Sequence, residues 1–363
     1  MGSILKEFKY IWPFNHQNEF EFKPTTATFS VEEIPLYEFS GSGEHLILKV
    51  RKKNLTTWEM IDIISSHIGI KKREIGYAGL KDKHAITTQY ISMPKIYEDR
   101  LKDLSHPQIK ILDIFYHNNK IRVGHLKGNR FWMRFKRVKN TQRVKLDTLI
   151  KWIKNSGMPN YFGVQRFGNS GLNYLEGKDI IDGTIKLRDR KKREFLISAY
   201  QSFLFNNIVA KRVELCNLLE SFKSGEVEKI FNFPKDSLKD INNQKQFFKL
   251  LDGDLYMHYP FGKIFYEETQ IAVDRFSKKD ISPTGLIAGK RVKYAKDLAF
   301  EIEKEYNYTI NQPGSRRYLW IFPDIEERRY IQEEGWYELK FYLPKGSYAT
   351  VLVDFLKGNI AQK

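Results

Sequence analysis

Alternating apolar and polar positions predict a β-strand over residues 45–52. Leu46, Leu48 and Val50 fall on one face of this segment, and the opposite face carries two basic side chains. Successive side chains of a strand point to opposite sides of the sheet, so a period of two indicates a strand with one covered face. We therefore expect a sheet that is covered mainly on one side.

A helix is predicted directly after this strand. Thr56 and Glu59 stand at capping-box spacing, and Gly69 supplies a stop. Four apolar residues between them recur at helical spacing, namely Met60, Ile61, Ile64 and Ile68. A glycine-rich turn over residues 76–89 follows, and it runs into a strand predicted over residues 86–93.

Three further elements follow from the same periodicities. Phe131, Met133 and Phe135 alternate with Trp132, Arg134 and Lys136, which predicts a strand that is basic on its open side. Residues 147–155 have the pattern of a short helix, and residues 295–306 have that of an amphipathic helix.

Turn-forming residues divide the rest of the chain. Several occur in a row over Gly157–Gly163, where we place a domain boundary, and Ser282–Gly285 is predicted to be a turn. Residues 337–343 and the run that begins at Pro344 resemble two strands about a tight turn. Because their alternation matches the first third of the chain, we expect this tail to return to the first domain's sheet.

A dense basic run precedes the next predicted helix. Six of the eight residues from Lys186 to Arg193 are Lys or Arg, and apolar residues at helical spacing follow from Leu196 to Ile208. We expect the run to lie just before that helix. Such a run is either a solvated face or a phosphate contact, and its position beside Arg166 favours contact.

Composition narrows the class of protein. The 363 residues suit two domains better than one, and a net charge of +17 favours a polyanionic partner, with nucleic acid the first candidate. No apolar run approaches the roughly 18 residues that a membrane span needs. The single cysteine, Cys216, cannot form an internal disulfide and is expected to be a buried apolar filler. We therefore expect a reducing, cytoplasmic compartment and no membrane partner.

Asp82 is the residue that most informs function. It stands between Lys81 and Lys83, with His84 close behind. The side chain could cap the turn, ligate a metal together with His84, or act directly in catalysis, and the two lysines make a metal the weakest of these. A lone acid among cations is useful where substrate phosphates occupy the cations and leave the carboxylate to act on a nucleotide.

Asn129 and Phe131 form a second candidate cluster at the entrance to a strand. An asparagine amide offers a donor and an acceptor to a pyrimidine edge, and the ring two residues on points to the same face. Such a pair could hold a flipped base. The alternative is a turn cap followed by a core phenylalanine.

Five segments together resemble the TruD family of pseudouridine synthases. They occur in the order seen in that family and cover nearly the whole chain: Gly76–Gln89, Gly124–Phe131, Pro159–Gly168, Ser198–Asn206 and Leu343–Thr350. Five ordered motifs make coincidence implausible.

The resemblance implies an α+β fold. A catalytic domain with a mixed, mainly antiparallel sheet and flanking helices would comprise residues 1–156 and 321–363, and an inserted α/β TRUD domain would comprise residues 157–320. The implied activity is isomerisation of uridine to pseudouridine in transfer RNA, at position 13 in the bacterial members. No cofactor and no metal are implied, and we predict no protein partner besides the tRNA substrate.

The resemblance also implies roles for individual residues. The catalytic aspartate falls on Asp82, and substrate-binding positions fall on Lys23, Phe29, Glu33, Asn129, Phe131 and Tyr348. From their charge and position we assign RNA contacts to Lys81, Lys83, His84, Arg166, Arg190, Lys191, Lys192 and Arg193.

The chain departs from the family pattern at three places. The usual Glu-Asp before Phe29 is Ala27–Thr28, the Arg-Glu that often ends the last motif is Asp354–Phe355, and position 348 is Tyr where Phe also occurs. None of these changes touches Asp82. The carboxylate could attack C1′, add to C6 of the base or abstract a sugar proton, and the sequence does not choose among these routes.

Overall fold

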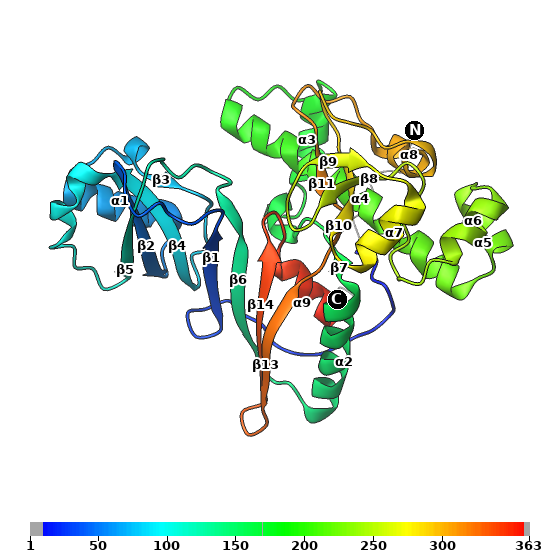
Figure 1. Cartoon of the computed structure of the whole chain (residues 1–363), viewed down its shortest axis with the longest axis horizontal. Coiled ribbons are helices and arrows are strands. Elements are labelled where there is room, and N and C mark those ends of the chain that lie inside the picture. The colour runs from blue at the N-terminus through cyan, green and yellow to red at the C-terminus, as the bar shows by residue number, and fades with distance from the viewer. Residues whose placement is uncertain (1–9, 169, 359–363) are drawn as a thin grey trace. The chain divides into compact units, whose positions relative to one another are not determined.

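The computed structural model describes residues 10–168 and 170–358. Two compact units divide this chain (Figure 1). The sheet unit comprises residues 19–150 and 323–346. The α4 unit, named after its longest helix, comprises the described parts of residues 1–18, 151–322 and 347–363.

An eight-stranded sheet forms the sheet unit. Its strands are β1 (Phe29–Pro35), β2 (His45–Lys53), β3 (Gly76–Tyr77), β4 (Ile86–Pro94), β5 (Ile109–His117), β6 (Leu126–Phe135), β13 (Asp324–Ile331) and β14 (Trp336–Pro344). The order is β13-β14-β6-β1-β4-β2-β5, with β3 beside β4. Only the β1–β4 pair is parallel among the pairings of these described strands. The predicted α+β fold with a mainly antiparallel sheet is therefore confirmed.

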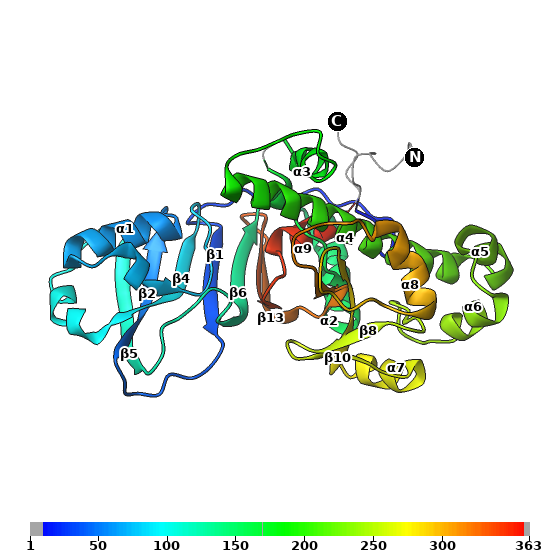
Figure 2. The same ribbon diagram turned by 90° about the horizontal axis from the view of Figure 1, so that it is seen from above.

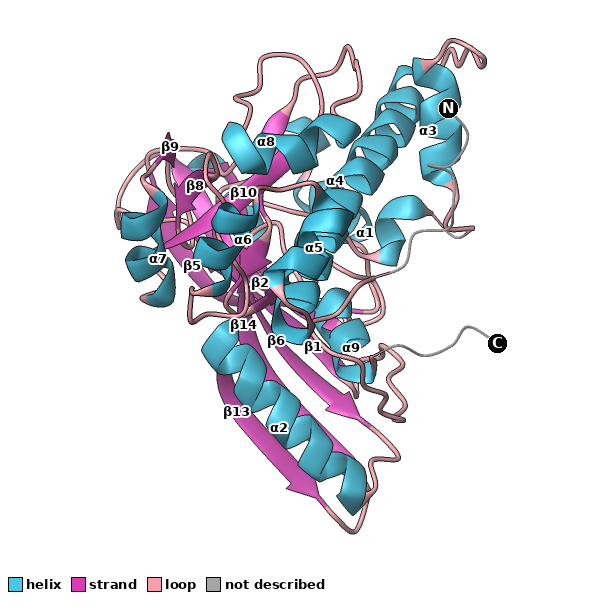
Figure 3. Ribbon diagram, turned by 90° about the vertical axis from the view of Figure 1, so that its right-hand side faces the viewer, coloured by secondary structure: helices cyan, strands magenta, loops and turns pink. Residues whose placement is uncertain are grey.

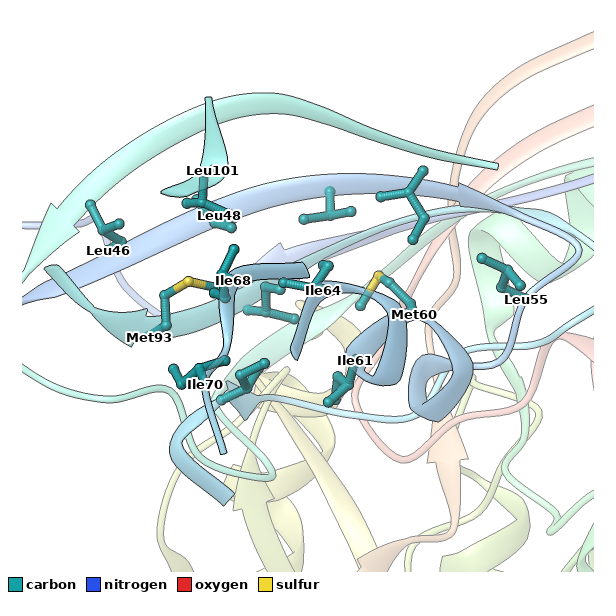
Figure 4. Packing of buried hydrophobic residues seen from close by; sticks show 14 residues of the cluster. Leu46, Leu48, Leu55, Met60, Ile61, Ile64, Ile68, Ile70, Met93 and Leu101 are labelled. Carbon is teal, nitrogen blue, oxygen red and sulfur yellow. The ribbon is translucent and has the colours of Figure 1, made fainter. Parts of the chain in front are cut away.

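The strands predicted over residues 45–52, 86–93 and 131–136 and the first helix occur where the pattern places them. Helix α1 (Thr57–Ile68) carries the complete capping box of Thr56 and Glu59, and it ends at Gly69 in the left-handed conformation with φ +70°. Its apolar stripe packs on one face of β2 and β4 (Figure 4). Fourteen buried residues form this core: Leu46, Leu48, Val50, Leu55, Met60, Ile61, Ile64, Ile68, Ile70, Ile75, Ile91, Met93, Leu101 and Ile109.

The C-terminal strands return to the sheet as expected. β14, with nine residues, pairs antiparallel with β6, which has ten. β13 and β14 form an antiparallel hairpin (Figure 3). The sequence did not lead us to predict β13, since Glu326–Arg329 is uniformly charged and has no apolar alternation.

The α4 unit combines helices with two small sheets. Its helices are α2 (Asn140–Ser156, which begins in the sheet unit), α3 (Asn173–Ile181), α4 (Arg190–Ser221), α5 (Ser224–Phe231), α6 (Lys235–Asn242), α7 (Thr269–Ser277), α8 (Asp297–Glu303) and α9 (Ala349–Lys357). Its strands are β7 (Met158–Pro159), β8 (Leu255–His258), β9 (Ile264–Tyr266), β10 (Ile281–Ile287), β11 (Ser315–Tyr318) and β12 (Trp320–Ile321). Strands pair in the orders β11-β10-β8-β9 and β12-β7.

Helix α3 packs closely along α4 (Figure 2). A Cβ atom at Gly177 would lie 2.1 Å from the Leu196 carbonyl oxygen, so only glycine permits this approach. Next to it the rings of Tyr174 and Phe203 stack with centroids 4.2 Å apart. The glycine thus brings two aromatic rings into contact between the helices.

The prediction of a turn at Ser282–Gly285 was wrong, because these residues lie inside β10. The Thr284 hydroxyl donates to the Leu255 carbonyl at 2.7 Å. A Cβ at Gly285 would lie 2.5 Å from Leu319 Cδ2 and 3.0 Å from Phe205 Cε2. The glycine is needed for close packing rather than for a turn.

The prediction of a strand after Pro344 was also wrong, because residues 349–357 form α9. The β-branched residues of this run favour a strand locally. However, its buried residues also include Leu352, Phe355 and Leu356, whose spacing of three and four is helical. Tertiary packing of this stripe outweighs the local β-propensity.

Two helix starts differ from their predictions. α2 begins at Asn140 rather than at residue 147. The basic run does not end before α4, because Arg190–Arg193 form its first turn. Asp189 is the N-cap, and its side chain accepts from the Lys192 amide at 3.0 Å.

The compact units divide the chain after residues 150 and 322, close to the predicted boundaries at 156 and 320. Residues 10–18 and 347–358 group with the α4 unit by their contacts. Assignment of the two family domains to particular segments stays a prediction. Among the described residues, none of the helices is both long and apolar enough to cross a membrane.

Asp354 in α9 is partly buried, and its Oδ2 atom is shielded from solvent. Among the described residues, Asp354 Oδ2 has no hydrogen-bond partner. Burial raises the pKa of Asp354 to about 6, although attraction to Lys357 opposes the shift. A raised carboxyl pKa means that protonation favours the folded state. This contribution is complete below about pH 4 and is lost as the pH rises through about 6.

Asp354→Asn should therefore stabilise the protein at pH 8 by about 1–3 kcal/mol, and it should have little effect at pH 4. The measurement is the midpoint of urea unfolding at both pH values, with the exposed Asp240→Asn as the matched control. A stability difference that is the same at pH 4 and pH 8 would contradict this assignment.

Candidate active site around Asp82

Asp82 lies in the loop of residues 78–85 between β3 and β4, and its side chain is exposed. Among the described residues, its carboxylate accepts no hydrogen bond and forms no ion pair. The carboxylate therefore does not cap the turn, which removes one of the three interpretations. It is free to meet a ligand from solvent.

Asp82 and His84 are the side chains of this loop that could ligate a metal. Within residues 10–168 and 170–358, no group of three or more His, Cys, Asp or Glu side chains is placed to hold a metal ion. His84 is exposed and follows the acid on the same loop. Direct action of the carboxylate on a substrate stays a prediction.

Lys81 is buried and paired, which differs from the expectation of an RNA contact. Its Nζ lies 2.5 Å from Glu33 Oε2, and the two side chains are 5% and 1% exposed. The Tyr90 amide donates to the other Glu33 oxygen at 3.2 Å. Burial raises the pKa of Glu33 in spite of its attraction to Lys81 and these hydrogen bonds. Lys81 therefore anchors the loop to β1, and its ammonium does not face an RNA phosphate.

Lys83 is paired at the surface. Its Nζ lies 2.7 Å from Glu59 Oε1, at the start of α1. The hydrogen bond from Lys83, together with one from the Thr56 amide, lowers the pKa of Glu59 to about 2. Because exposed ion pairs are weak, a phosphate can compete for Lys83. The RNA contact of Lys83 stays a prediction. The two lysines differ because the Lys83 ammonium is exposed to solvent and the Lys81 ammonium is buried.

The loop backbone is also held. The Lys81 amide donates to Thr57 Oγ1 at 2.9 Å, and Thr57 Oγ1 donates in turn to Gln89 Oε1 at 3.0 Å. Thr57 and Gln89 are buried. This relay joins the loop to the first turn of α1 and to β4, so Asp82 lies on a supported segment and not on a free loop.

Glu33 and Asn129 lie opposite one another on β1 and β6. Lys81 therefore reaches from the Asp82 loop to the strand pair that carries Asn129. The buried Asn129 Oδ1 has no hydrogen-bond partner among the described residues, and the same holds for Thr87 Oγ1 and Gln89 Nε2 on β4. Unsatisfied buried polar atoms are rare and call for an explanation such as a ligand or a water molecule.

The two predicted phenylalanines pack together on the same face of the sheet. Phe29 and Phe131 are each 6% exposed, and their rings stack with centroids 6.2 Å apart and an interplanar angle of 3°. Phe131 also stacks on Phe341 of β14 at 5.4 Å. In this conformation the rings form a wall of packed aromatics beside Asn129.

Lys23 lies outside this cluster and is exposed. Its carbonyl accepts from the Thr28 hydroxyl at 2.6 Å, and the same hydroxyl accepts from the Thr25 amide at 3.0 Å. Thr28 replaces an acid that is usual in the family pattern. Its hydroxyl satisfies the turn before β1, so no carboxylate is needed there.

The other predicted residues belong to the α4 unit. Arg166 donates to Ser202 Oγ at 3.2 Å and to Ser198 Oγ. The Tyr348 ring lies with its centroid 5.9 Å from that of Phe162. Residues from three of the five sequence motifs therefore meet in this unit.

Two residues of this cluster were missed from the sequence. Arg317 is partly buried, with Cζ 4.1 Å from the Phe162 ring centroid and 5.7 Å from that of Tyr348. Burial lowers the pKa of Arg317 to about 10. Phe162 is held through its backbone, because Asn206 accepts from its amide at 2.7 Å and donates to its carbonyl at 3.0 Å. The motif Pro159–Gly168 contains Phe162, whereas no motif marks Arg317.

The start of α4 is exposed and basic. Arg190 pairs with Glu194 at 2.8 Å. Lys191, Lys192 and Arg193 form no ion pair with any residue that the structure describes. These three cations are available to an anion.

A recess of about 750 Å³ opens elsewhere in the sheet unit, beside β5. Its lining includes Arg51, Lys53 and Lys110 but not Asp82. The candidate site therefore rests on the chemistry of the Asp82 loop and the neighbouring polar face, and not on the size of a cavity.

The sheet unit and the ordered motifs can be compared with known families of pseudouridine synthases. The family model described as tRNA pseudouridine synthase D (TruD) matches residues 15–188 and 185–354. The chain belongs to this family.

Individual proteins agree with this membership. The chain is 51% identical to a tRNA pseudouridine synthase D of Sulfurimonas denitrificans over 337 residues, which cover 93% of this chain and 94% of that protein. It is 52% identical over 338 residues to the protein of the same description from Nitratiruptor sp., with the same coverage. It is 44% identical over 360 residues to one from Helicobacter pylori, with 95% and 94% coverage.

A solved structure supports the fold. The crystal structure of a TruD protein from Methanosarcina mazei matches with a TM-score of 0.68 at 18% identity, and the match covers 96% of this chain and 95% of that one. The predicted fold and family are confirmed.

The buried pair of Lys81 and Glu33 gives a testable prediction. Lys81→Met should destabilise the protein by about 3–5 kcal/mol, because it leaves Glu33 buried without a counter-ion, and adding Glu33→Gln should recover part of that loss. Urea unfolding of the single and double variants measures both effects.

The matched control is Lys83→Met, which removes the exposed partner of Glu59 on the same loop. It should leave stability nearly unchanged, because exposed ion pairs contribute little. Equal destabilisation by Lys81→Met and Lys83→Met would refute the distinction between the two lysines.

Proposed function

We propose that the chain isomerises uridine to pseudouridine in tRNA, with Asp82 as the catalytic carboxylate and without a cofactor. The observation that carries the proposal is the unpaired carboxylate of Asp82 on an anchored loop, in a chain about half identical to tRNA pseudouridine synthases. By analogy with bacterial members of the family, we place the target at position 13.

The reaction sets the requirements for the site. The N-glycosidic bond must break, the uracil must turn while it is retained, and a carbon–carbon bond to C5 must form. An ionised carboxylate can serve by attacking C1′, by adding to C6 or by abstracting a sugar proton. On each route the carboxylate must be able to reach the substrate. Lys81 and Lys83 form ion pairs with Glu33 and Glu59, so neither lysine is paired with Asp82.

The polar face beside the loop suits a uracil. The Asn129 amide can pair with the base edge, which carries acceptors and a donor. Extruding a base costs a few kcal/mol of stacking, which contact with an aromatic ring offsets at about 1–3 kcal/mol per base. We assign base contact to Asn129, Phe131 and Phe29, and we retain Lys23, Glu33 and Tyr348 as substrate-binding proposals from the family resemblance.

For backbone contacts we propose the exposed start of α4. Lys191, Lys192 and Arg193 are available cations at a helix N-terminus, where the helix dipole also favours anions. Arg166, Arg190, Lys83 and His84 remain proposed contacts of the same kind. We also propose that the protein works in the reducing cytoplasm, because its proposed substrate is tRNA and its single cysteine, Cys216, is buried and free.

Asp82→Asn should abolish pseudouridine formation, with a loss of at least about 10³-fold in the single-turnover rate, because the amide cannot act as a nucleophile or base. Affinity for tRNA should stay within about threefold, since the side chain binds no phosphate. Asp99→Asn removes another exposed acid of the sheet unit and is the matched control. An active Asp82→Asn enzyme would instead favour a non-catalytic RNA-binding protein.

Replacing Lys191 and Lys192 by Ala should weaken tRNA binding and lower the slope of log Kd against log salt by about 1–2, because each lost phosphate contact removes about one released counter-ion. Fluorescence anisotropy with labelled tRNA measures both quantities. Lys235→Ala with Lys245→Ala removes equal charge from another exposed part of the α4 unit. If the control variant lowers the slope by the same amount, the change reflects the total charge of the protein and not a phosphate contact at the start of α4.

A further inference from the structure

A buried lysine holds the residue that carries the proposed catalytic carboxylate. Lys52 of β2 is fully buried, and its Nζ donates to the Leu55 carbonyl at 2.5 Å and to the Asp82 carbonyl at 3.0 Å. It forms no ion pair with any described residue. The acceptors are two backbone oxygens, one just before α1 and one at the centre of the Asp82 loop.

Burying an ammonium group without a paired anion is unfavourable. Burial lowers the pKa of Lys52 to about 8, and repulsion from Lys81 acts in the same direction. Attraction to Asp82 and Glu59 opposes the shift but does not cancel it. A methionine would fill similar space without this penalty, so the ammonium is not explained by stability alone.

The contacts of Lys52 complete the support of the loop. The amide of Lys81 is held by Thr57, and the ammonium of Lys83 is held by Glu59. The Lys52 ammonium donates to the carbonyl of Asp82, which lies between Lys81 and Lys83. Three consecutive loop residues are thus tied to a single segment, residues 52–59. Only the Asp82 carboxylate is left without a partner among these contacts.

Geometry at this residue determines where the carboxylate points. A shift of about 1 Å in a reacting group can lower a rate by about 100-fold. A carbonyl held by a charged donor fixes the peptide plane next to Asp82, and it therefore restricts the directions that the side chain can take. Such a contact affects the chemical step more than the affinity for RNA.

We propose that Lys52 is a positioning residue for the reaction, whose protonated ammonium holds the Asp82 carbonyl and so directs the Asp82 carboxylate at the substrate. This inference rests on the proposed catalytic role of Asp82. The charged groups that face the ammonium are Asp82 and Lys81 of the loop and Glu59 of α1. Loss of the proton weakens the charge-assisted hydrogen bonds to both carbonyls.

The pH dependence separates positioning from stability. Activity should fall as the pH rises through about 8, when Lys52 loses its proton. Stability responds in the opposite sense. Because the folded state binds this proton less tightly than the unfolded chain does, the contribution of Lys52 to stability increases between about pH 8 and 10.5. An alkaline loss of activity in a fully folded enzyme is therefore the signature of positioning.

The experiment measures single-turnover pseudouridine formation on a tRNA transcript from pH 6 to 9.5, with circular dichroism at each pH. The wild-type rate should fall above about pH 8 while the protein stays folded. Lys52→Met should lower the rate at pH 7 by about 10- to 100-fold, with tRNA affinity within about twofold and no alkaline fall. Lys53→Met, on the exposed neighbour, should behave as wild type.

Lys52→Arg keeps the charge and should move the alkaline fall beyond the measured range. A flat wild-type rate up to pH 9.5, which requires no variant, would overturn the inference. So would a folded Lys52→Met enzyme with a rate within twofold of wild type. If Asp82→Asn is inactive in the same assay, either result overturns the role of Lys52 alone, whereas an active Asp82→Asn overturns the proposed catalytic acid.

Discussion

The ion pair between Lys81 and Glu33 is the interaction on which the candidate site depends. Both side chains are almost completely buried, and a buried pair gains little net stability because both ions lose their hydration. What the pair does is join the Asp82 loop to β1. The neighbouring Glu59 takes up Lys83 in a similar way at the surface. As a result the two cations that flank Asp82 in sequence are occupied by other acids.

This arrangement reconciles a strongly basic chain with an unpaired acid. A net charge of +17 attracts RNA over distances up to the Debye length, about 8–10 Å at physiological salt. An unpaired ammonium beside Asp82 would bind the carboxylate directly and compete with the substrate. The cations that can attract RNA and the unpaired carboxylate lie at different places in the structure. Exposed cations such as Lys191 and Lys192 are available to phosphates, while the buried Lys81 next to Asp82 holds the loop.

Local signals predicted a large part of the fold. The α1 capping box, the strand at residues 45–52 and the return of β14 all depend on patterns within about ten residues, and all three are confirmed. Failures occurred where packing outweighed the local pattern. The run after Pro344 has β-branched residues yet forms α9, and Gly285 lies inside β10, where a Cβ would lie 2.5 Å from Leu319 Cδ2.

The candidate site was predictable only in its residue types. The motifs that contain Asp82 and Asn129 belong to one unit, whereas the RNA contact of Lys81 was inferred from its charge and position and did not anticipate its burial. The partner of Lys81 is 48 residues earlier in the chain, and that of Lys83 is 24 residues earlier. Lys52 lies 30 residues before Asp82. No periodicity of a single sequence links residues at such distances, so these contacts required the three-dimensional structure.

Three buried polar atoms on β4 and β6 have no hydrogen-bond partner among the described residues. Asn129 Oδ1, Thr87 Oγ1 and Gln89 Nε2 are buried and unsatisfied within the described chain. Each such atom costs about 1–3 kcal/mol, and apolar residues of similar size would remove that cost. The Asn129 oxygen can only accept, the Gln89 nitrogen can only donate, and the Thr87 hydroxyl can do either. Thr87 and Gln89 lie on β4, which follows the Asp82 loop, and Asn129 lies on β6. A ligand edge with both donors and acceptors, as in uracil, can complement all three atoms, whereas a phosphate has no donor for the Asn129 oxygen. This difference supports the base contact that we propose for Asn129.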